Sequence, residues 1–189
     1  VEIAVQINAL NQGRIVLHGE DMVVHVASIE SAGKRQDAQV ETGPNGALSL
    51  KTEPPPSLGQ ATLYLAFDAP LPKVPEGLYR TQAGGDWYAF TQFEPLEARK
   101  AFPCFDQPEF KTPYSFRLTV PRGMTALTTT PEVSREETDT MTTFEFGTSK
   151  PIPTYLVAFA VGPFDLVSAR PGTFPNGLAF RVAAVKGKG

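Results

Sequence analysis

The 189-residue chain of 20.5 kDa is long enough to bury a hydrophobic core, and its 41% apolar residues exclude a wholly disordered protein. Its 16 glycines and 18 prolines exclude a helical bundle, because proline interrupts helices and central strands alike. The net charge of −3 argues against a nucleic-acid partner bound by phosphate neutralisation. No run reaches the roughly 18 apolar residues that a membrane span needs.

Short runs of alternating apolar and polar residues, separated by turn-forming residues, predict β-strands along the whole chain. In chain order the runs cover 1–7, 15–17, 22–26, 47–50, 63–67, 87–90, 114–120, 144–146 and 178–185. A further run, 155–161, is apolar throughout, which predicts a strand covered on both faces. Many short strands with turns between them are typical of an all-β sandwich or barrel.

One segment interrupts the strand pattern. Pro95 suits the first position of a helical turn and good helix formers follow it, so one short helical turn is predicted near 95–102. Pro103 ends this turn, and residues 103–108 are too irregular for a strand. Long irregular connections either carry function or serve packing.

The residues most often used for metal binding and nucleophilic catalysis are scarce. His18 and His25 are the only histidines, and their spacing in a strand region places their side chains on opposite faces. Cys104 is the only cysteine, and its aromatic neighbours favour a buried, unreactive thiol. The sequence therefore predicts no catalytic residue and no metal ligand in this chain.

Gln92 and Glu94 form the most suggestive pair. They alternate along the sequence, so both side chains point the same way at the end of a strand. A carboxylate and an amide oxygen accept hydrogen bonds from an ammonium group, which offers donors only. The residues by themselves leave two interpretations open, a receptor for a substrate ammonium or an ordinary solvated strand end.

The region around this pair resembles a known family. The sequences at 91–95 (Thr-Gln-Phe-Glu-Pro) and 98–108 (Ala-Arg-Lys-Ala-Phe-Pro-Cys-Phe-Asp-Gln-Pro) resemble the N-terminal domain of the zinc aminopeptidases of the gluzincin class, the aminopeptidase N and oxytocinase family. Residues 15–19, 111–116 and 154–164 resemble the same domain, so the resemblance covers most of the chain. Gln107 departs from the family pattern, which usually has Glu there.

The resemblance implies a mostly antiparallel, saddle-shaped β-sandwich, with residues 1–189 as a single β domain. It implies a parent enzyme that uses zinc and removes N-terminal residues from peptides, with the zinc ligands in a separate thermolysin-like catalytic domain. It also implies that Gln92 and Glu94 bind the substrate α-amine and that this domain packs on the catalytic domain. Because the strand pattern begins at Val1 without a lead-in, we expect a piece of a longer protein, inactive alone.

Two other functions fit the same strand pattern. A non-catalytic relative of the family would use the domain as an interaction scaffold. An unrelated carbohydrate-binding or adhesion module could stack a ligand on a platform of Trp87, Tyr88 and Phe90.

Overall fold

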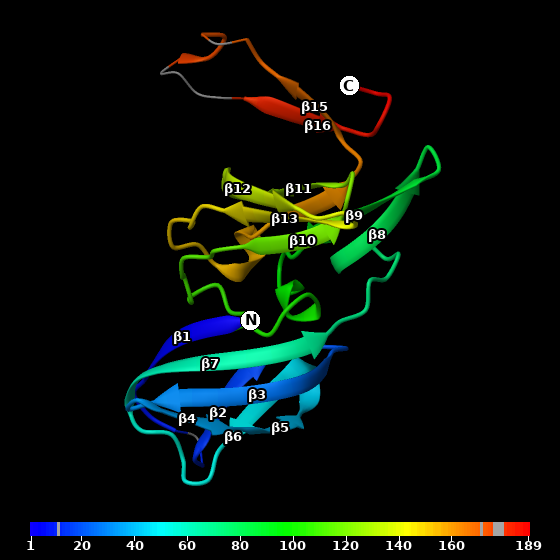
Figure 1. Ribbon diagram of the computed structural model, residues 1–189. Coiled ribbons are helices and arrows are strands. Elements are labelled where there is room, and N and C mark those ends of the chain that lie inside the picture. The colour runs from blue at the N-terminus through cyan, green and yellow to red at the C-terminus, as the bar shows by residue number, and fades with distance from the viewer. Residues whose placement is uncertain (11, 171, 176–179) are drawn as a thin grey trace.

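The computed structural model describes residues 1–10, 12–170, 172–175 and 180–189. Within these residues the strands form five antiparallel sheets, and the connections between them include the short 3-10 turns η1 to η3. The sheets gather into a lower lobe, an upper lobe and a C-terminal hairpin (Figure 1). The predicted all-β, mostly antiparallel fold is confirmed. Among the described residues, every helix is too short to cross a membrane.

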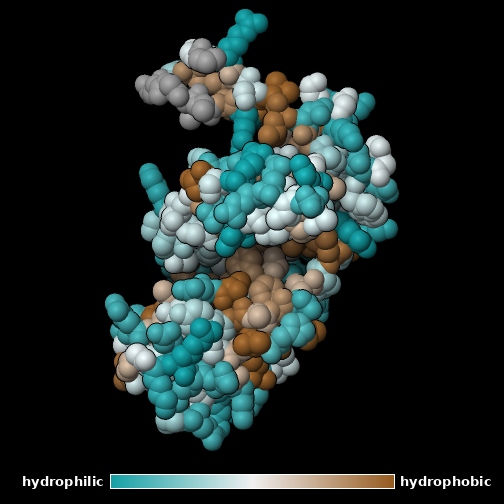
Figure 2. Space-filling view, in the orientation of Figure 1, coloured by the Kyte–Doolittle hydropathy of each residue, from teal (hydrophilic) through white to brown (hydrophobic). Residues whose placement is uncertain are grey.

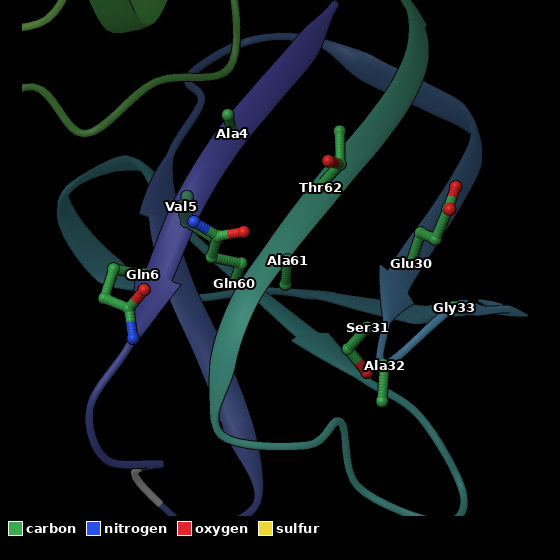
Figure 3. Close-up of a pocket in the computed structure, with 10 residues that line it drawn as sticks. All are labelled: Ala4, Val5, Gln6, Glu30, Ser31, Ala32, Gly33, Gln60, Ala61 and Thr62. Carbon is green, nitrogen blue, oxygen red and sulfur yellow. The ribbon is translucent and has the colours of Figure 1, made fainter.

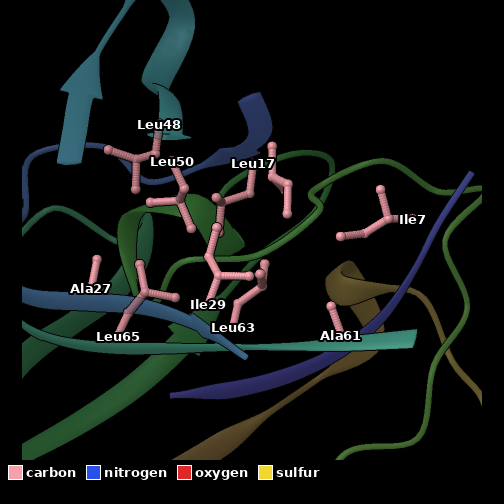
Figure 4. Close-up of a cluster of buried hydrophobic side chains, with 10 residues drawn as sticks. Ile7, Leu17, Ala27, Ile29, Leu48, Leu50, Ala61, Leu63 and Leu65 are labelled. Atoms are coloured by element: carbon pink, nitrogen blue, oxygen red, sulfur yellow. The ribbon is translucent and has the colours of Figure 1, made fainter. Parts of the chain in front are cut away.

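The lower lobe is a sandwich of two sheets. One sheet has the order β1-β7-β3-β4 and the other β2-β6-β5. Leu17, Leu48 and Leu50 reach from one sheet toward Ile29 and Leu63 of the other, as Figure 4 shows. Its strands are β1 (Glu2–Ile7), β2 (Arg14–His18), β3 (Val23–Ser31), β4 (Lys34–Asp37), β5 (Gln39–Thr42), β6 (Ala47–Lys51) and β7 (Gly59–Asp68).

The upper lobe holds two sheets of its own, ordered β11-β14-β9-β8 and β10-β13-β12. Phe144 and Phe146 are buried in one of its two cores, and Phe93 is buried in the other. Its strands are β8 (Gly77–Ala83), β9 (Asp86–Gln92), β10 (Arg117–Pro121), β11 (Thr125–Thr128), β12 (Glu132–Glu137), β13 (Met141–Phe146) and β14 (Phe159–Gly162). The hairpin β15 (Asp165–Ser168) and β16 (Arg181–Ala184) follows.

Two stretches of chain link the lobes. Residues 70–75 run from β7 in the lower lobe to β8 in the upper lobe (Figure 1). The segment 93–106, which contains the 3-10 turn η2 (Ala98–Lys100), lies against both lobes, because Cys104 and His18 exchange two backbone hydrogen bonds of 2.8 and 2.9 Å. The other 3-10 turns are η1 (Pro44–Gly46) and η3 (Thr154–Leu156).

The structure corrects three boundaries. The predicted strand at 155–161 begins as η3 and becomes β14 only at Phe159. The reason is that the Thr154 hydroxyl, at the start of η3, is hydrogen-bonded to the Asp106 carboxylate. In the predicted strand at 114–120, residues 114–116 lie outside β10, and Tyr114 N–H instead donates to Ser149 Oγ. In the predicted strand at 178–185, only 181–184 form β16, and residues 178 and 179 lie outside the described part of the chain.

Candidate functional site

Gln92 ends β9, and Glu94 lies two residues further, at the start of a turn. Both side chains are exposed, whereas Phe93 between them is only 2% exposed. The Gln92 Nε2 group lies 3.5 Å from the backbone oxygen of Glu94, to which it donates. The predicted alternation, with both polar side chains directed outward, is therefore present in the structure.

Phe93 fixes this short stretch to the upper core. Its ring meets the Phe102 ring edge-on at a centroid distance of 5.8 Å and the Phe159 ring at 6.1 Å. The Phe93 carbonyl accepts a hydrogen bond of 2.9 Å from the Glu97 N–H, which closes the turn that contains Glu94. Because neighbouring residues of an extended chain point to opposite sides, burial of the Phe93 ring directs Gln92 and Glu94 outward.

The cation beside this turn is already paired. Lys100 Nζ lies 2.6 Å from a Glu97 carboxylate oxygen and 2.9 Å from a Glu76 carboxylate oxygen. The hydrogen bond to Glu97 and, to a smaller extent, the one to Glu76 raise the pKa of Lys100 above its ordinary value. The Lys100 ammonium therefore stays charged and paired with these two carboxylates. Within the described part of the chain, the Glu94 carboxylate has no ion pair. Its negative charge is therefore not neutralised by a neighbouring cation of these residues.

Gly77 permits the approach of Lys100 to the strand pair. It is the register partner of Gln92 and has a φ of +63°. A Cβ atom at this position would lie 2.7 Å from the Lys100 Cβ, closer than two carbon atoms tolerate. Glycine is thus required here both by the backbone angle and by the space available.

A buried ion pair joins Arg99 to Asp106 in the segment that follows Glu94. Asp106 is fully buried, and its Oδ2 accepts hydrogen bonds from the Arg99 Nε at 2.9 Å and the Arg99 N–H at 3.2 Å. Its Oδ1 accepts a bond of 2.6 Å from the Thr154 hydroxyl. Arg99 Nη1 also donates to the Asn45 carbonyl in the lower lobe. Arg99 and Asp106 therefore tie this loop both to Thr154 and to the lower lobe.

The histidines and the cysteine make their contacts away from Gln92 and Glu94. His18 Nδ1 accepts a hydrogen bond from the Asp106 N–H at 3.3 Å, and burial, followed by the charge of Arg99, lowers the pKa of His18. His25 lies on a different strand, where its Nε2 meets Asp68. Cys104 is 5% exposed, so the thiol is buried as predicted, and this burial raises the pKa of the thiol far above its ordinary value.

The residues of the described chain do not fit a zinc site. Throughout residues 1–10, 12–170, 172–175 and 180–189, His, Cys, Asp and Glu side chains nowhere gather in a group of three that could hold a metal ion.

The structure does not support the alternative in which aromatic side chains form a stacking platform. Tyr88 is 2% exposed, with its ring packed against Phe164 at 5.2 Å, whereas Trp87 is 41% exposed. Adjacent strand residues point to opposite faces, so Trp87 and Tyr88 cannot offer one stacking surface. Arg80 and Lys73 instead lie over the Trp87 ring, at 4.9 and 5.5 Å from its centroid.

Two of the concavities that the described residues form lie in different lobes. The larger, of about 480 Å³, is formed on the lower lobe by β1, β7 and the turn after β3, and Gln6, Glu30 and Gln60 are among its polar residues (Figure 3). It contains no residue of the segment 92–106. The smaller, of about 200 Å³, includes Thr91 and Phe159 and therefore borders the strand end that carries Gln92. Hydrophobic surface gathers at the waist between the lobes in Figure 2.

Sequence reasoning missed the contribution of Thr154 and of the cluster formed by Glu76, Glu97 and Lys100. Thr154 lies 48 residues from Asp106, and a threonine before an apolar run carries no local sign of such a contact. Glu97 and Lys100, three residues apart, could have indicated an ion pair on a helical turn. Their shared partner Glu76 depends on the close approach at Gly77, which no local pattern predicts.

The sequence is similar to several known aminopeptidases. Aminopeptidase M1-D of Oryza sativa subsp. japonica is 33% identical over 178 residues, which are 92% of this chain and 20% of that protein. The puromycin-sensitive aminopeptidase of Caenorhabditis elegans is 31% identical over 182 residues, 91% of this chain and 19% of its own length. The glutamyl aminopeptidase of Homo sapiens is 48% identical over 80 residues, 41% of this chain and 8% of its own length.

The chain therefore spans about a fifth of the length of the first two relatives. The family described as the peptidase M1 N-terminal domain matches residues 1–156, which include the lower lobe, the upper lobe up to the strand β14, the Gln92 and Glu94 pair and the buried Asp106. The chain belongs to the peptidase M1 N-terminal domain family.

Proposed function

We propose that residues 1–189 are a single β domain of a zinc-dependent aminopeptidase, which helps to bind the free α-amine of a peptide substrate. Glu94 pairs with the substrate ammonium, and Gln92 hydrogen-bonds to the ammonium or to the adjacent carbonyl. The relatives named above are aminopeptidases, which supports this class of reaction. A site that holds the terminal amine next to the reacting bond favours removal of one residue at a time from the N-terminus.

The observation that carries the proposal is the arrangement of charge at the end of β9. Glu94 is exposed and directed outward by the buried Phe93, while the neighbouring Lys100 is held by Glu76 and Glu97. An ammonium group that reaches Glu94 thus meets an available carboxylate and does not have to displace a protein cation. Hydrogen bonds between charged groups are stronger and shorter than neutral ones.

The domain works with a second part of the parent protein. The chain spans about a fifth of the length of the first two relatives named above, and its described residues hold no group of side chains suited to zinc. We therefore place the zinc ligands, and the residues that activate water, in a catalytic domain against which this domain packs. The 189-residue chain alone is expected to show no peptidase activity.

The test is kinetic and uses the full-length protein. Replacing Glu94 by Ala or Gln removes the charge that binds the ammonium, so KM should rise and kcat/KM should fall by about 10- to 1,000-fold. The matched control is Glu136→Gln, because Glu136 is an exposed glutamate on β12, away from the end of β9. Wild-type kinetics in the Glu94 variants would refute the assignment. An inactive wild-type parent would instead favour an interaction scaffold.

A further inference from the structure

We infer that Asp106 is a positioning residue for the amine-binding pair. Its two carboxylate oxygens join the two chain segments whose aromatic rings clamp Phe93, and this clamp sets the directions of Gln92 and Glu94. The inference rests on the proposed function of Gln92 and Glu94 and assigns them a supporting structure that neither residue contacts directly.

The first segment joined by Asp106 is 98–102. The Arg99 backbone N–H and Nε both donate to Asp106 Oδ2, and the Arg99 Nη2 donates to the Asp106 carbonyl at 3.1 Å. Ala98 and Ala101 on either side of Arg99 are 0% and 7% exposed. Held in this way, the segment presents the Phe102 ring edge-on to Phe93.

The second segment is 154–159. Thr154, which is 2% exposed, donates its hydroxyl to Asp106 Oδ1 and begins η3. Val157, also 2% exposed, ends that turn, and Phe159 then starts β14. The Phe159 ring packs on Phe93, and the Phe159 N–H donates to Thr91 Oγ1 at 3.1 Å.

Asp106 therefore holds in place both segments that pack against Phe93. Phe93 is held between a ring from each segment, and Thr91, the residue before Gln92, is bonded to the second of them. Gln92 and Glu94 flank Phe93, so a rotation of the Phe93 backbone would turn both polar side chains. In a binding site, a displacement of about 1 Å in a positioned group can change rates by roughly a hundredfold.

The chemistry of the contact requires a carboxylate. Both Asp106 oxygens face donors, so each must accept hydrogen bonds, and only an ionised carboxylate accepts with both. A buried acceptor that loses its donor carries an unfavourable free energy of desolvation. Thr154→Val removes one donor with almost no change in side-chain shape and leaves the contacts of Arg99 in place.

The experiment measures recognition of the amine separately from the amount of active enzyme. In the full-length protein, the inhibition constants of a competitive dipeptide inhibitor with a free α-amine and of its des-amino analogue are compared. The ratio of the two constants reports the interaction with the ammonium alone. Loss of folded protein lowers the apparent kcat but leaves this ratio unchanged.

Thr154→Val should reduce the preference for the amine by about 5- to 100-fold, while Thr154→Ser, which keeps the hydroxyl, should retain most of it. Phe159→Leu should reduce the preference as well, because it removes one ring of the clamp and keeps an apolar side chain. The matched control is Ser28→Ala, which removes a hydroxyl that is equally buried (1% exposed) and hydrogen-bonded to Arg35 in the lower lobe. This control should keep the wild-type ratio.

The outcomes distinguish a failure of the positioning role of Asp106 from a failure of amine binding by Glu94. If Glu94→Gln abolishes the preference for the amine but Thr154→Val and Phe159→Leu keep it, the positioning role of Asp106 is overturned. If Glu94→Gln itself keeps the preference, the proposed function has failed. Should Thr154→Val yield no soluble enzyme, Phe159→Leu decides in the same way, with an unchanged ratio counting against the inference.

Discussion

In the lower lobe, the two sheets are joined by aliphatic side chains that alternate along their strands, such as Leu48, Leu50 and Leu63. In the segment 93–106, a buried ion pair, a hydroxyl group and edge-on aromatic rings hold the chain. The first kind of contact is non-directional and depends on the area buried. The second kind depends on donors and acceptors at fixed positions.

This difference matches what each region has to do. A sandwich core must only exclude water, and many combinations of apolar residues of suitable volume achieve that. A stretch that presents Gln92 and Glu94 to a ligand needs one backbone direction, and directional bonds between Asp106, Arg99 and Thr154 can supply it. The polar contacts are therefore expected to be the less tolerant of substitution.

The largest loss of stability is expected from Asp106→Ala. The substitution leaves the Arg99 guanidinium, whose side chain is 11% exposed, buried without its counter-ion and deprives Thr154 of its acceptor. Removing one partner of a buried ion pair lowers the free energy of unfolding by about 3 to 5 kcal/mol. Urea denaturation of the 189-residue chain measures the loss.

The control for this variant is Asp68→Ala, because the side chain of Asp68 is 82% exposed while it pairs with His25. Its stability should stay within about 1 kcal/mol of wild type. Equal urea midpoints for the Asp106 and Asp68 variants would show that the buried ion pair does not stabilise the segment 93–106. The two regions would then not differ in the kind of contact that holds them.

A loss of similar or slightly smaller size is expected in the lower lobe from Leu63→Ala. Leu63 is fully buried and is the register partner of both Ile3 and Ile29. Truncation of a buried leucine to alanine leaves a cavity and lowers the free energy of unfolding by about 2 to 5 kcal/mol. Thr62→Ala, on the other face of β7, serves as the control.

This variant also tests whether the two regions unfold together. His18 and Cys104 exchange backbone hydrogen bonds across the lobes, and Arg99 donates to the Asn45 carbonyl. We therefore expect a single transition in which near-ultraviolet circular dichroism and tryptophan fluorescence coincide for Leu63→Ala. Separate transitions would divide the molecule into two independently stable regions.

The same difference explains what could be predicted from sequence. The strands of the lower core, such as β1, β6 and β7, were found because alternation of apolar residues is a local signal. β12, which is rich in charged and polar residues, has no such alternation and is defined only by its pairing with β13. The β4 and β5 strands are likewise short and polar.

The candidate site divides in the same way. Gln92, Phe93 and Glu94 are neighbours in sequence, so their alternation could be predicted. The supporting contacts join positions far apart, Thr154 to Asp106 and Arg99 to Asn45, and depend on how the lobes come together. In the predicted strand at 155–161, residues 159–161 belong to β14, but residues 155 and 156 lie in η3, where the hydroxyl of Thr154 binds Asp106.

A smaller effect is expected from the protonation of His18. Its Nδ1 must be unprotonated to accept from the Asp106 N–H, and burial followed by the charge of Arg99 lowers its pKa in the folded state, although the Asp106 carboxylate acts in the opposite direction. The unfolded chain, with a His pKa of about 6.5, thus binds the proton more tightly. The contribution of His18 to stability is complete above this pH and is lost as the pH falls toward the lower folded-state pKa.

The measurement compares urea midpoints at pH 7.5 and pH 5.5 for wild type and for His18→Asn, whose amide oxygen can replace Nδ1 as acceptor and does not titrate. Wild type should lose more stability than the variant over this interval. His25 is present in both proteins, so its contribution cancels in the comparison. An identical loss in both would exclude His18 as a source of the pH dependence.

The smallest effect is expected from the ion pair between Arg14 and Glu41 on the surface of the lower lobe. The two charged groups lie 2.6 Å apart, but their side chains are 33% and 51% exposed. Exposed pairs contribute about 0.2 to 1 kcal/mol, and salt screens them. Arg14→Gln should therefore shift the urea midpoint slightly at low salt and hardly at all in 1 M sodium chloride. A loss close to that of Asp106→Ala would mean that directional charge pairing also holds the lower lobe, and burial would no longer distinguish the two regions.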